Sequence, residues 1–196
     1  QKEELEKAFY MMPIHSDLLN YWKKNEETEP IKKALRFLLL SNFTFLGKGD
    51  SIRYGAGGGA HKDFDLFKKN LEFTFGKLEF TLFNNCNFER FIKGVSFKQD
   101  GRNDEEKTLI YCDPPYLGTT DNYSHSFKEQ DSLDLFNTLE ETKCKWAMSE
   151  FDHPFILQQA KERNLNVIEI GERQNLKNRR TEILVTNYKT NQLELF

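Results

Sequence analysis

The stretch "TLIYCDPPYLGTT" (residues 108–120) joins an apolar run to an acidic residue, two prolines and an aromatic residue. Its "LIYC" part has the β-branched and aromatic composition of a buried strand. We expect the strand to end at Asp113, because each of the two prolines that follow lacks a backbone N–H and has a fixed φ. In open α/β sheets the reactive groups gather beyond the carboxyl ends of the strands. Asp113 therefore occupies a position where catalytic residues are found.

Helix-like and strand-like segments alternate on the carboxyl side of this stretch. Helices are predicted over 130–143 and 155–164, and strands over 144–150, 165–171 and 181–188. Strands that alternate with helices of about 10 to 15 residues are typical of an α/β domain with a mostly parallel sheet.

The amino-terminal part has a different character. Helices are predicted over 1–11, 15–25, 29–40 and 63–73, a strand over 78–84, and the start of another helix near Asn87. The glycine-rich segment "SNFTFLGKGDSIRYGAGGGA" (41–60) predicts a loop or an irregular hairpin. We therefore divide the chain into a helical, glycine-rich part (1–75) and an α/β part (76–196).

Composition limits the class of protein. The formal net charge is -3 and the isoelectric point is about 5.9, so any nucleic-acid contact must use local basic patches. The three cysteines match neither a disulfide framework nor a metal site, which indicates reduced core residues in a cytoplasmic protein. The four histidines have no ligand spacing, and we expect no metal.

The sequence contains no apolar run of about 18 residues, so no membrane span is predicted. Because the first residue is Gln1, we expect a fragment, a processed chain or the ordered part of one.

The turn at Asp113 offers an acceptor-rich surface to a donor. A nucleobase amino group is such a donor, but its lone pair is delocalised and it is a poor nucleophile. If Asp113 and the Pro114 carbonyl accept its two hydrogens, they stabilise the positive charge that grows as the nitrogen attacks a methyl group. Tyr116 then provides a flat face for a base rotated out of its stack. The alternative is an ordinary strand-ending turn, since Asp and Pro are common turn residues.

The run resembles the Asp-Pro-Pro-Tyr motif of the Dam-type (D12 class) adenine-N6 DNA methyltransferases. Four more segments are similar to that family in the same order: "ALRFLLLSNFTFLGKG" (34–49), "FNNCNFERFI" (83–92), "KWAMSE" (145–150) and "RRTEILVTNY" (179–188). The resemblance implies a Rossmann-like S-adenosylmethionine-dependent methyltransferase sheet with an inserted DNA-recognition region, here the part over 1–75. It also implies double-stranded DNA as substrate, and a bacterial or phage-infected cell.

By this resemblance, Asp113, Pro114, Pro115 and Tyr116 are the catalytic and target-adenine residues. Asn87 and Phe88 stand where the family has an Asp-Phe pair beside the cofactor's adenine, and Asp113 borders the same cofactor. Asn87 departs from the pattern because it carries no charge; its alternative role is the N-cap of the following helix.

The family's cofactor loop is missing from its usual place. Nothing before residue 31 has the required strand, phenylalanine- and glycine-rich loop and second strand. The letters of "FLGKGD" (45–50) match the loop, but glycines alone are a weak signal without a flanking strand and helix. The sheet is therefore expected to be incomplete. Either a missing segment or a partner chain supplies the cofactor part, or the protein is a catalytically silent DNA-binding or subunit-like homologue.

Two basic segments and the tail are candidate contacts with other molecules. Lys48, Arg53 and Tyr54 in the glycine-rich segment, and Arg179 and Arg180 between two strands, are the predicted DNA-binding residues. The alternative is that these charged loops are only solvated. The tail Gln192–Phe196, "QLELF", resembles the peptide by which bacterial replication proteins bind the sliding clamp. The alternative is that the tail folds back onto the core.

The substrate also has an alternative. The acceptor-lined turn would equally suit methylation of an amino or amide group in RNA or protein.

Overall fold

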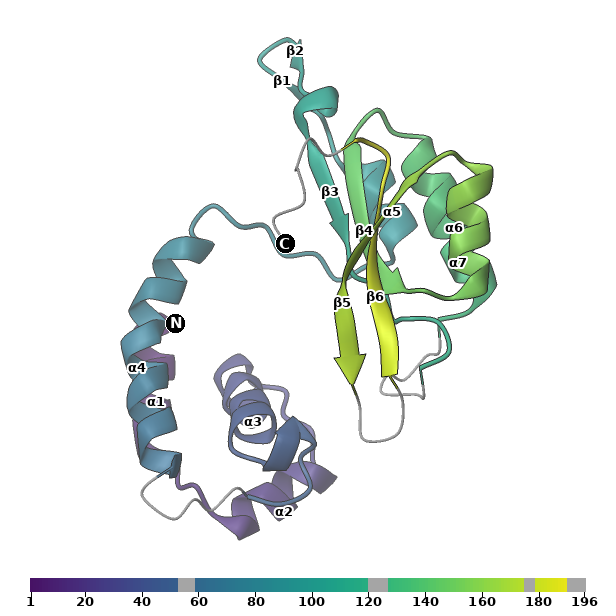
Figure 1. The fold of residues 1–196 in the computed structure, drawn as a ribbon. Coiled ribbons are helices and arrows are strands. Elements are labelled where there is room, and N and C mark those ends of the chain that lie inside the picture. Colours follow the sequence, from purple (N-terminus) through teal and green to yellow (C-terminus); the bar gives the residue numbers. More distant parts are fainter. Residues whose placement is uncertain (53–58, 120–126, 175–178, 190–196) are drawn as a thin grey trace. The chain divides into compact units, whose positions relative to one another are not determined.

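The computed structural model describes residues 1–52, 59–119, 127–174 and 179–189 (Figure 1). The chain forms two compact units, Gln1–Phe83 and Asn84–Phe196. The division predicted from the sequence, between residues 75 and 76, lies eight residues before the one in the structure.

The amino-terminal unit consists of helices. They are α1 (Lys2–Met11), α2 (Ser16–Lys24), α3 (Pro30–Asn42), the 3-10 helix η1 (Phe45–Gly47) and α4 (Gly59–Leu78). The first three helices confirm the prediction. α3 begins at Pro30 because the carboxylate of Glu29 accepts hydrogen bonds from the backbone N–H groups of Ile31 and Lys32, at 3.0 and 2.9 Å. The buried residues of this unit include Phe9, Leu19, Trp22, Leu35, Leu39 and Phe43.

The described part of the glycine-rich segment is an irregular hairpin, as predicted. Thr44 and Ile52 form an isolated antiparallel bridge. The Thr44 hydroxyl donates to the Leu40 carbonyl at 2.5 Å and accepts from the Gly49 N–H at 2.8 Å. Gly49 has a φ of 74°, which a residue with a side chain rarely adopts. These bonds join the loop to the end of α3.

The predicted strand over 78–84 is wrong. α4 runs to Leu78, beyond the predicted helix over 63–73, and the residues that follow are irregular. Phe80 and Leu82 are 92% and 91% exposed. The alternating pattern fits a strand, but a strand forms only where a neighbour accepts its hydrogen bonds. No described strand pairs with this segment.

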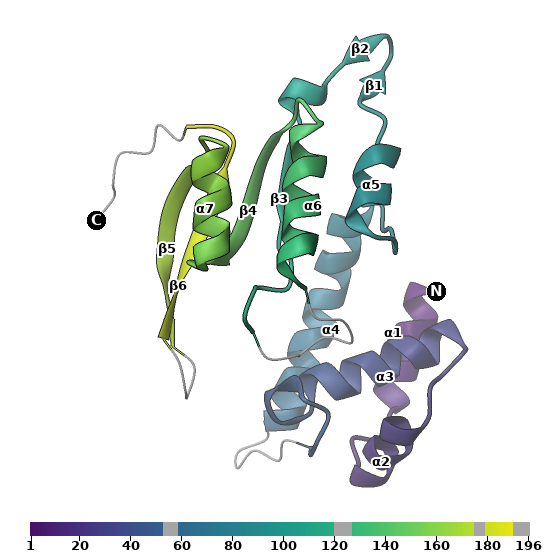
Figure 2. The ribbon, with the colours of Figure 1, turned by 90° about the vertical axis from the view of Figure 1, so that its right-hand side faces the viewer.

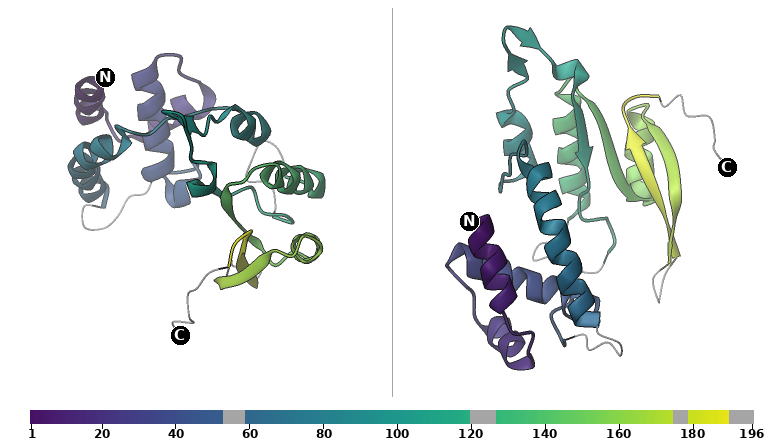
Figure 3. Two further views of the ribbon diagram at one scale, coloured as in Figure 1. Left: turned by 90° about the horizontal axis from the view of Figure 1, so that it is seen from above. Right: turned by 90° about the vertical axis from the view of Figure 1, so that its left-hand side faces the viewer.

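The carboxyl-terminal unit is an α/β domain. Its helices are α5 (Phe88–Gly94), the 3-10 helix η2 (Glu105–Lys107), α6 (Glu129–Glu140) and α7 (Pro154–Glu162). Its strands are β1 (Lys98–Gln99), β2 (Arg102–Asn103), β3 (Leu109–Cys112), β4 (Lys145–Phe151), β5 (Asn166–Gln174) and β6 (Arg179–Thr186). The main sheet has the order β3-β4-β6-β5. α5, α6 and α7 lie on one face of it (Figures 2 and 3).

The expectation of a mostly parallel sheet is wrong. Among the described strands only β3 and β4 are parallel, with Leu109 opposite Lys145 and Cys112 opposite Met148. β6 is antiparallel to both β4 and β5. The reason lies in the connections: α6 provides the crossover from β3 to β4, which a parallel pair requires, whereas the four residues 175–178 between β5 and β6 are too few for a crossover helix.

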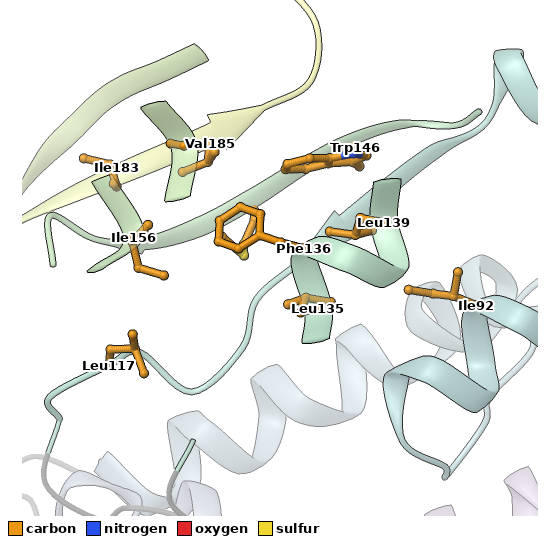
Figure 4. Close-up of a cluster of buried hydrophobic side chains, with 11 residues drawn as sticks. Ile92, Leu117, Leu135, Phe136, Leu139, Trp146, Ile156, Ile183 and Val185 are labelled. Atoms are coloured by element: carbon orange, nitrogen blue, oxygen red, sulfur yellow. The ribbon is translucent and has the colours of Figure 1, made fainter. Parts of the chain in front are cut away.

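One core joins the sheet to its helices and to the turn after β3 (Figure 4). The rings of Phe136 on α6 and Trp146 on β4 pack edge to face, with centroids 6.1 Å apart. Leu117, from the turn, is 3% exposed and belongs to the same cluster. Its burial fixes the far end of the turn to the core.

The cysteines are all free thiols. Cys144 is buried and Cys112 is half-buried, but Cys86 is exposed, so the prediction of three core cysteines is wrong for Cys86. Of the helices within the described residues, none has the length and apolar character that a membrane crossing needs.

Candidate active site

The Asp-Pro-Pro-Tyr turn lies at the carboxyl edge of the sheet. Asp113 follows the last residue of β3, and because β4 is parallel to β3, the carboxyl end of β4 lies at the same edge. Asp113 is exposed, while Pro114, Pro115 and Tyr116 are half-buried. The position that the sequence predicted for this carboxylate is confirmed, and the carboxylate is accessible.

A chain of hydroxyl groups reaches Asp113. The Ser149 hydroxyl donates to Asp113 Oδ1 at 3.2 Å, and the Tyr111 hydroxyl lies 2.8 Å from Ser149 Oγ. Serine has one hydroxyl proton, so when Asp113 accepts it, Tyr111 must be the donor to Ser149. Ser149 is 2% exposed. These bonds fix one oxygen of Asp113, and no hydrogen bond from a described residue reaches the other oxygen.

Tyr116 is oriented by its ring and by its hydroxyl. The ring packs edge to face against Phe151, with centroids 4.8 Å apart and planes at 86°. The hydroxyl donates to Glu182 Oε1 at 2.8 Å, and Glu182 Oε2 pairs with Arg173 Nε at 3.0 Å. Burial is the largest cause that raises the pKa of Tyr116, so the side chain stays a neutral phenol. In the structure its hydroxyl is a hydrogen-bond donor to Glu182.

Glu150 is a buried carboxyl group at the end of β4. Its side chain is fully buried, and its two oxygens accept from the backbone N–H groups of Leu117 and Phe151, at 2.8 and 2.6 Å. Burial raises the pKa of Glu150 to about 7, although these two bonds and the charge of Arg180 act in the opposite direction. The carboxyl group binds the segment that follows Tyr116.

Arg180 binds the same segment through its carbonyls. Its Nη1 donates to the Leu117 carbonyl at 3.1 Å, and its Nη2 donates to the Gly118 carbonyl at 2.7 Å. The guanidinium also lies 5.4 Å from the centre of the Phe151 ring. Arg179 forms an ion pair with Glu172. The sequence predicted DNA contacts for both arginines, and those contacts stay predictions; the structure places Arg180 against the turn.

Asn87 and Phe88 begin α5. Asn87 Oδ1 accepts from the Arg90 backbone N–H at 2.9 Å, which is the N-cap role that the sequence left open. Phe88 is half-buried against the core and packs edge to face with Phe127, with centroids 6.4 Å apart. The predicted cofactor contacts of both residues stay predictions.

The remaining predicted residues lie elsewhere. Lys48 is exposed in the amino-terminal unit. Arg53, Tyr54 and the tail Gln192–Phe196 lie outside the described residues. Within the described ranges, no group of three or more His, Cys, Asp or Glu side chains is arranged to hold a metal ion.

Sequence reasoning missed three residues of this site: Ser149, Glu150 and Glu182. Each lies in a segment that resembles the methyltransferase family, but the sequence assigned a role to none of them. A signal was present, because Glu150 and Glu182 are acidic residues at the ends of apolar strand runs, where an unpaired carboxylate is costly. Such a residue needs a bonding partner, and here the partners are in or beside the turn.

The described strands form an open α/β sheet with an acceptor-rich turn at its carboxyl edge, which is where ligands bind in open α/β sheets. The family model of the D12 class N6 adenine-specific DNA methyltransferases matches residues 1–193, so the chain belongs to that family. The resemblance found in the sequence is confirmed, and the protein is a DNA adenine methyltransferase by family. Enzymes of this family act on DNA and generally use S-adenosylmethionine. No curated protein matches the chain significantly.

Proposed function

We propose that this chain transfers a methyl group from S-adenosylmethionine to the N6 amino group of an adenine rotated out of duplex DNA. The observation that carries the proposal is the exposed Asp113 carboxylate, held by a buried serine on a rigid turn at the open edge of the sheet. The neighbouring Tyr116 ring has an orientation fixed at both ends. A flipped base requires both a hydrogen-bonding group and a flat apolar surface.

Each group of the turn has a defined chemical task in this proposal. Asp113 and the Pro114 carbonyl accept the two amino hydrogens of adenine and favour a pyramidal nitrogen. The negative charge of Asp113 then stabilises the positive charge that develops on that nitrogen. The two prolines reduce the freedom of the turn, so little reorganisation is needed when the base arrives. The sulfonium of S-adenosylmethionine supplies the electrophilic methyl group.

Asn87 and Asp113 are the described residues best suited to the cofactor. The Asn87 carboxamide nitrogen makes no hydrogen bond to a described residue, and the side chain is exposed, so it can donate to a ring nitrogen of the cofactor's adenine. The ring of Phe88 packs on the core, so Phe88 is proposed to contribute to the cofactor site through its position next to Asn87.

We infer further that a strand from outside the described residues completes the cofactor site beside β3. Thr108 O accepts from Lys145 N at 3.0 Å, so by alternation Leu109 and Tyr111 direct their backbone groups away from β4, to an edge where no described strand pairs. Their side chains are 58% and 61% exposed. An apolar groove of about 260 Å³ lies beside them, lined in part by Phe91, Val95 and Phe97. An apolar strand would cover both.

The direct test of the function is a methylation assay. The full natural gene product is incubated with adenine-containing duplex DNA and S-adenosylmethionine, and mass spectrometry of the nucleosides measures N6-methyladenine. Methylation of DNA but not of RNA or protein supports the proposal. The absence of product, together with DNA binding but no calorimetric heat with S-adenosylmethionine, would instead identify a silent DNA-binding homologue. Comparing cofactor binding by residues 1–196 alone with that of the full product tests the added strand.

Tyr116→Ala is expected to lower kcat/KM for methyl transfer by about 10- to 100-fold, because stacking of a base on an aromatic ring contributes about 1–3 kcal/mol. Tyr116→Phe should stay within about threefold of the wild type. It keeps the ring on Phe151, and Glu182 keeps its pair with Arg173. The fluorescence of 2-aminopurine at the target position checks whether the base still leaves the helix. Equal losses in both variants would assign the role to the hydroxyl and contradict a stacking function.

We also propose contacts of this chain with DNA and with the sliding clamp. The residues proposed to contact DNA are those predicted from the sequence: Lys48, Arg53, Tyr54, Arg179 and Arg180. Alanine variants of the four charged residues should show a shallower dependence of DNA binding on salt, whereas Tyr54→Ala should weaken binding without changing that dependence. The tail Gln192–Phe196 is proposed to bind the sliding clamp. A pull-down with the intact tail tests this, and failure to retain the clamp removes the proposal.

A further inference from the structure

Two consecutive residues at the end of β4 bind the two ends of the Asp-Pro-Pro-Tyr turn. Ser149 Oγ donates to Asp113, the first residue of the turn, at 3.2 Å. Glu150 Oε1 accepts from the N–H of Leu117, the residue directly after Tyr116, at 2.8 Å. Ser149 and Glu150 are 2% and 0% exposed. The Glu150–Leu117 bond is therefore shielded from water, and the bond to the exposed Asp113 is shielded on its serine side.

The two contacts lie on opposite faces of the sheet. Consecutive side chains of a strand point to opposite faces. Trp146 lies four residues before Glu150 in β4, so the two side chains point to the same face of the sheet. Trp146 and Leu117 both belong to the core between this face and the helices (Figure 4). Ser149 instead meets Asp113 and Tyr111 on the other face. The turn thus crosses the carboxyl edge of the sheet, with Ser149 bound to it on one face and Glu150 on the other.

The burial of Glu150 has a cost that only its bonds offset. A carboxyl group without partners in an apolar environment is strongly destabilising. Here one oxygen is used for the N–H of Phe151 in its own strand and the other for the turn. Arg180 adds two bonds to the carbonyls of Leu117 and Gly118, so this short segment is bound through both its N–H and its C=O groups.

We propose that Ser149 and Glu150 are positioning residues that fix the Asp-Pro-Pro-Tyr turn for catalysis. Ser149 sets the orientation of the Asp113 carboxylate, and Glu150, with Arg180 beside it, sets where the segment after Tyr116 lies. The expected effect on the reaction rate rests on the proposed methyl transfer. The attachment of the turn to Ser149 and Glu150 does not depend on that proposal.

The kinetic test uses Ser149→Ala, Ser149→Thr and the control Ser132→Ala in the full natural gene product. Ser132 is an equally buried serine, 1% exposed, on α6, and no hydrogen bond joins it to the turn. Ser149→Ala is expected to lower kcat about tenfold and leave KM for DNA within about twofold. Ser149→Thr keeps a hydroxyl and should recover most of the lost rate. An unchanged kcat in Ser149→Ala, or a rate in Ser149→Thr as low as in alanine, overturns the role of Ser149.

The attachment test needs no activity. Backbone amide exchange of Leu117 is followed by NMR in the wild type, Glu150→Ala and Glu150→Gln. The exchange rate of the Leu117 amide is expected to rise at least about tenfold in Glu150→Ala and less in Glu150→Gln, which keeps an acceptor oxygen; the amide of Val185 in β6 should be unaffected. If Glu150→Ala does not fold, the glutamine variant decides alone. Unchanged exchange of Leu117 overturns the proposal. If the wild type does not methylate DNA, the proposed function fails while this result still stands.

Discussion

Replacement of Asp113 by alanine is expected to lower kcat/KM for adenine methylation by about 10³ while the fold stays intact. Removal of one group that stabilises charge in a transition state typically costs about 10²- to 10³-fold, and Asp113 is proposed both to accept an amino hydrogen and to supply the negative charge. The side chain is exposed, and among the described residues its one hydrogen-bond partner is Ser149. Its loss removes one hydrogen bond and should therefore lower the unfolding free energy by about 1 kcal/mol, too little to unfold the protein.

The measurement is steady-state methylation of duplex DNA, with chemical denaturation of each variant in parallel. Asp152→Ala is the matched control, because Asp152 is an exposed aspartate just beyond the carboxyl end of β4, the strand that neighbours β3. We expect the control to remain within about twofold of the wild type. Asp113→Asn keeps one acceptor oxygen but loses the charge, so its rate separates the two contributions. Activity of Asp113→Ala within about tenfold of the wild type would show that the carboxylate is not catalytic.

The position of the turn was predictable because its causes are local. "LIYC" has strand composition, and the prolines that follow Asp113 end any strand. The same holds for α3, where Glu29 and Pro30 define the start of the helix within a few residues. Such signals do not depend on what the rest of the chain does.

The direction of β6 and the state of residues 78–84 depend on distant segments. The strands β5 and β6 are separated by only four residues, too few for a crossover helix, so they must be antiparallel. The sequence prediction placed these two strands too far apart, at 165–171 and 181–188, for this constraint to be recognised. Residues 78–84 have the sequence pattern of a strand, but no described strand pairs with them. Whether a pairing strand is present cannot be deduced from the residues of the segment itself. Ser149 and Glu150 were missed for a related reason. Their partners are Asp113 and Leu117, more than 30 residues away in the sequence.

The stability of the protein is expected to fall between pH 5 and 8 because of Glu150. Its pKa is about 7 in the folded protein, against 4.5 for an ordinary glutamate. Between these values the folded state binds more protons than the unfolded state, so the unfolding free energy decreases as pH rises. A difference of this size corresponds to about 3 kcal/mol, present in full below pH 4.5 and lost as pH passes through 7.

Denaturant unfolding of the wild type and of Glu150→Gln at pH 5 and pH 8 isolates this effect, because glutamine does not titrate. The stability of the wild type relative to Glu150→Gln should be lower at pH 8 than at pH 5 by about 2 kcal/mol, because part of the full difference is already lost at pH 5. Glu169→Gln, on an exposed glutamate of β5, controls for the loss of a carboxylate at the surface. The same pH dependence in the wild type and in Glu150→Gln would show that the pKa of Glu150 is not raised.

The protonation of Glu150 also affects the turn, in the opposite direction to its effect on stability. Only the ionised carboxylate presents two acceptor oxygens, one to Leu117 and one to Phe151. A proton on either oxygen places a second donor opposite a backbone N–H, so one of the two bonds weakens. The ionised form therefore costs folding free energy because it is buried, and it is the form that holds the Leu117 end of the turn. A methylation rate that increases with pH through about 7, and loses that dependence in Glu150→Gln, is the expected consequence.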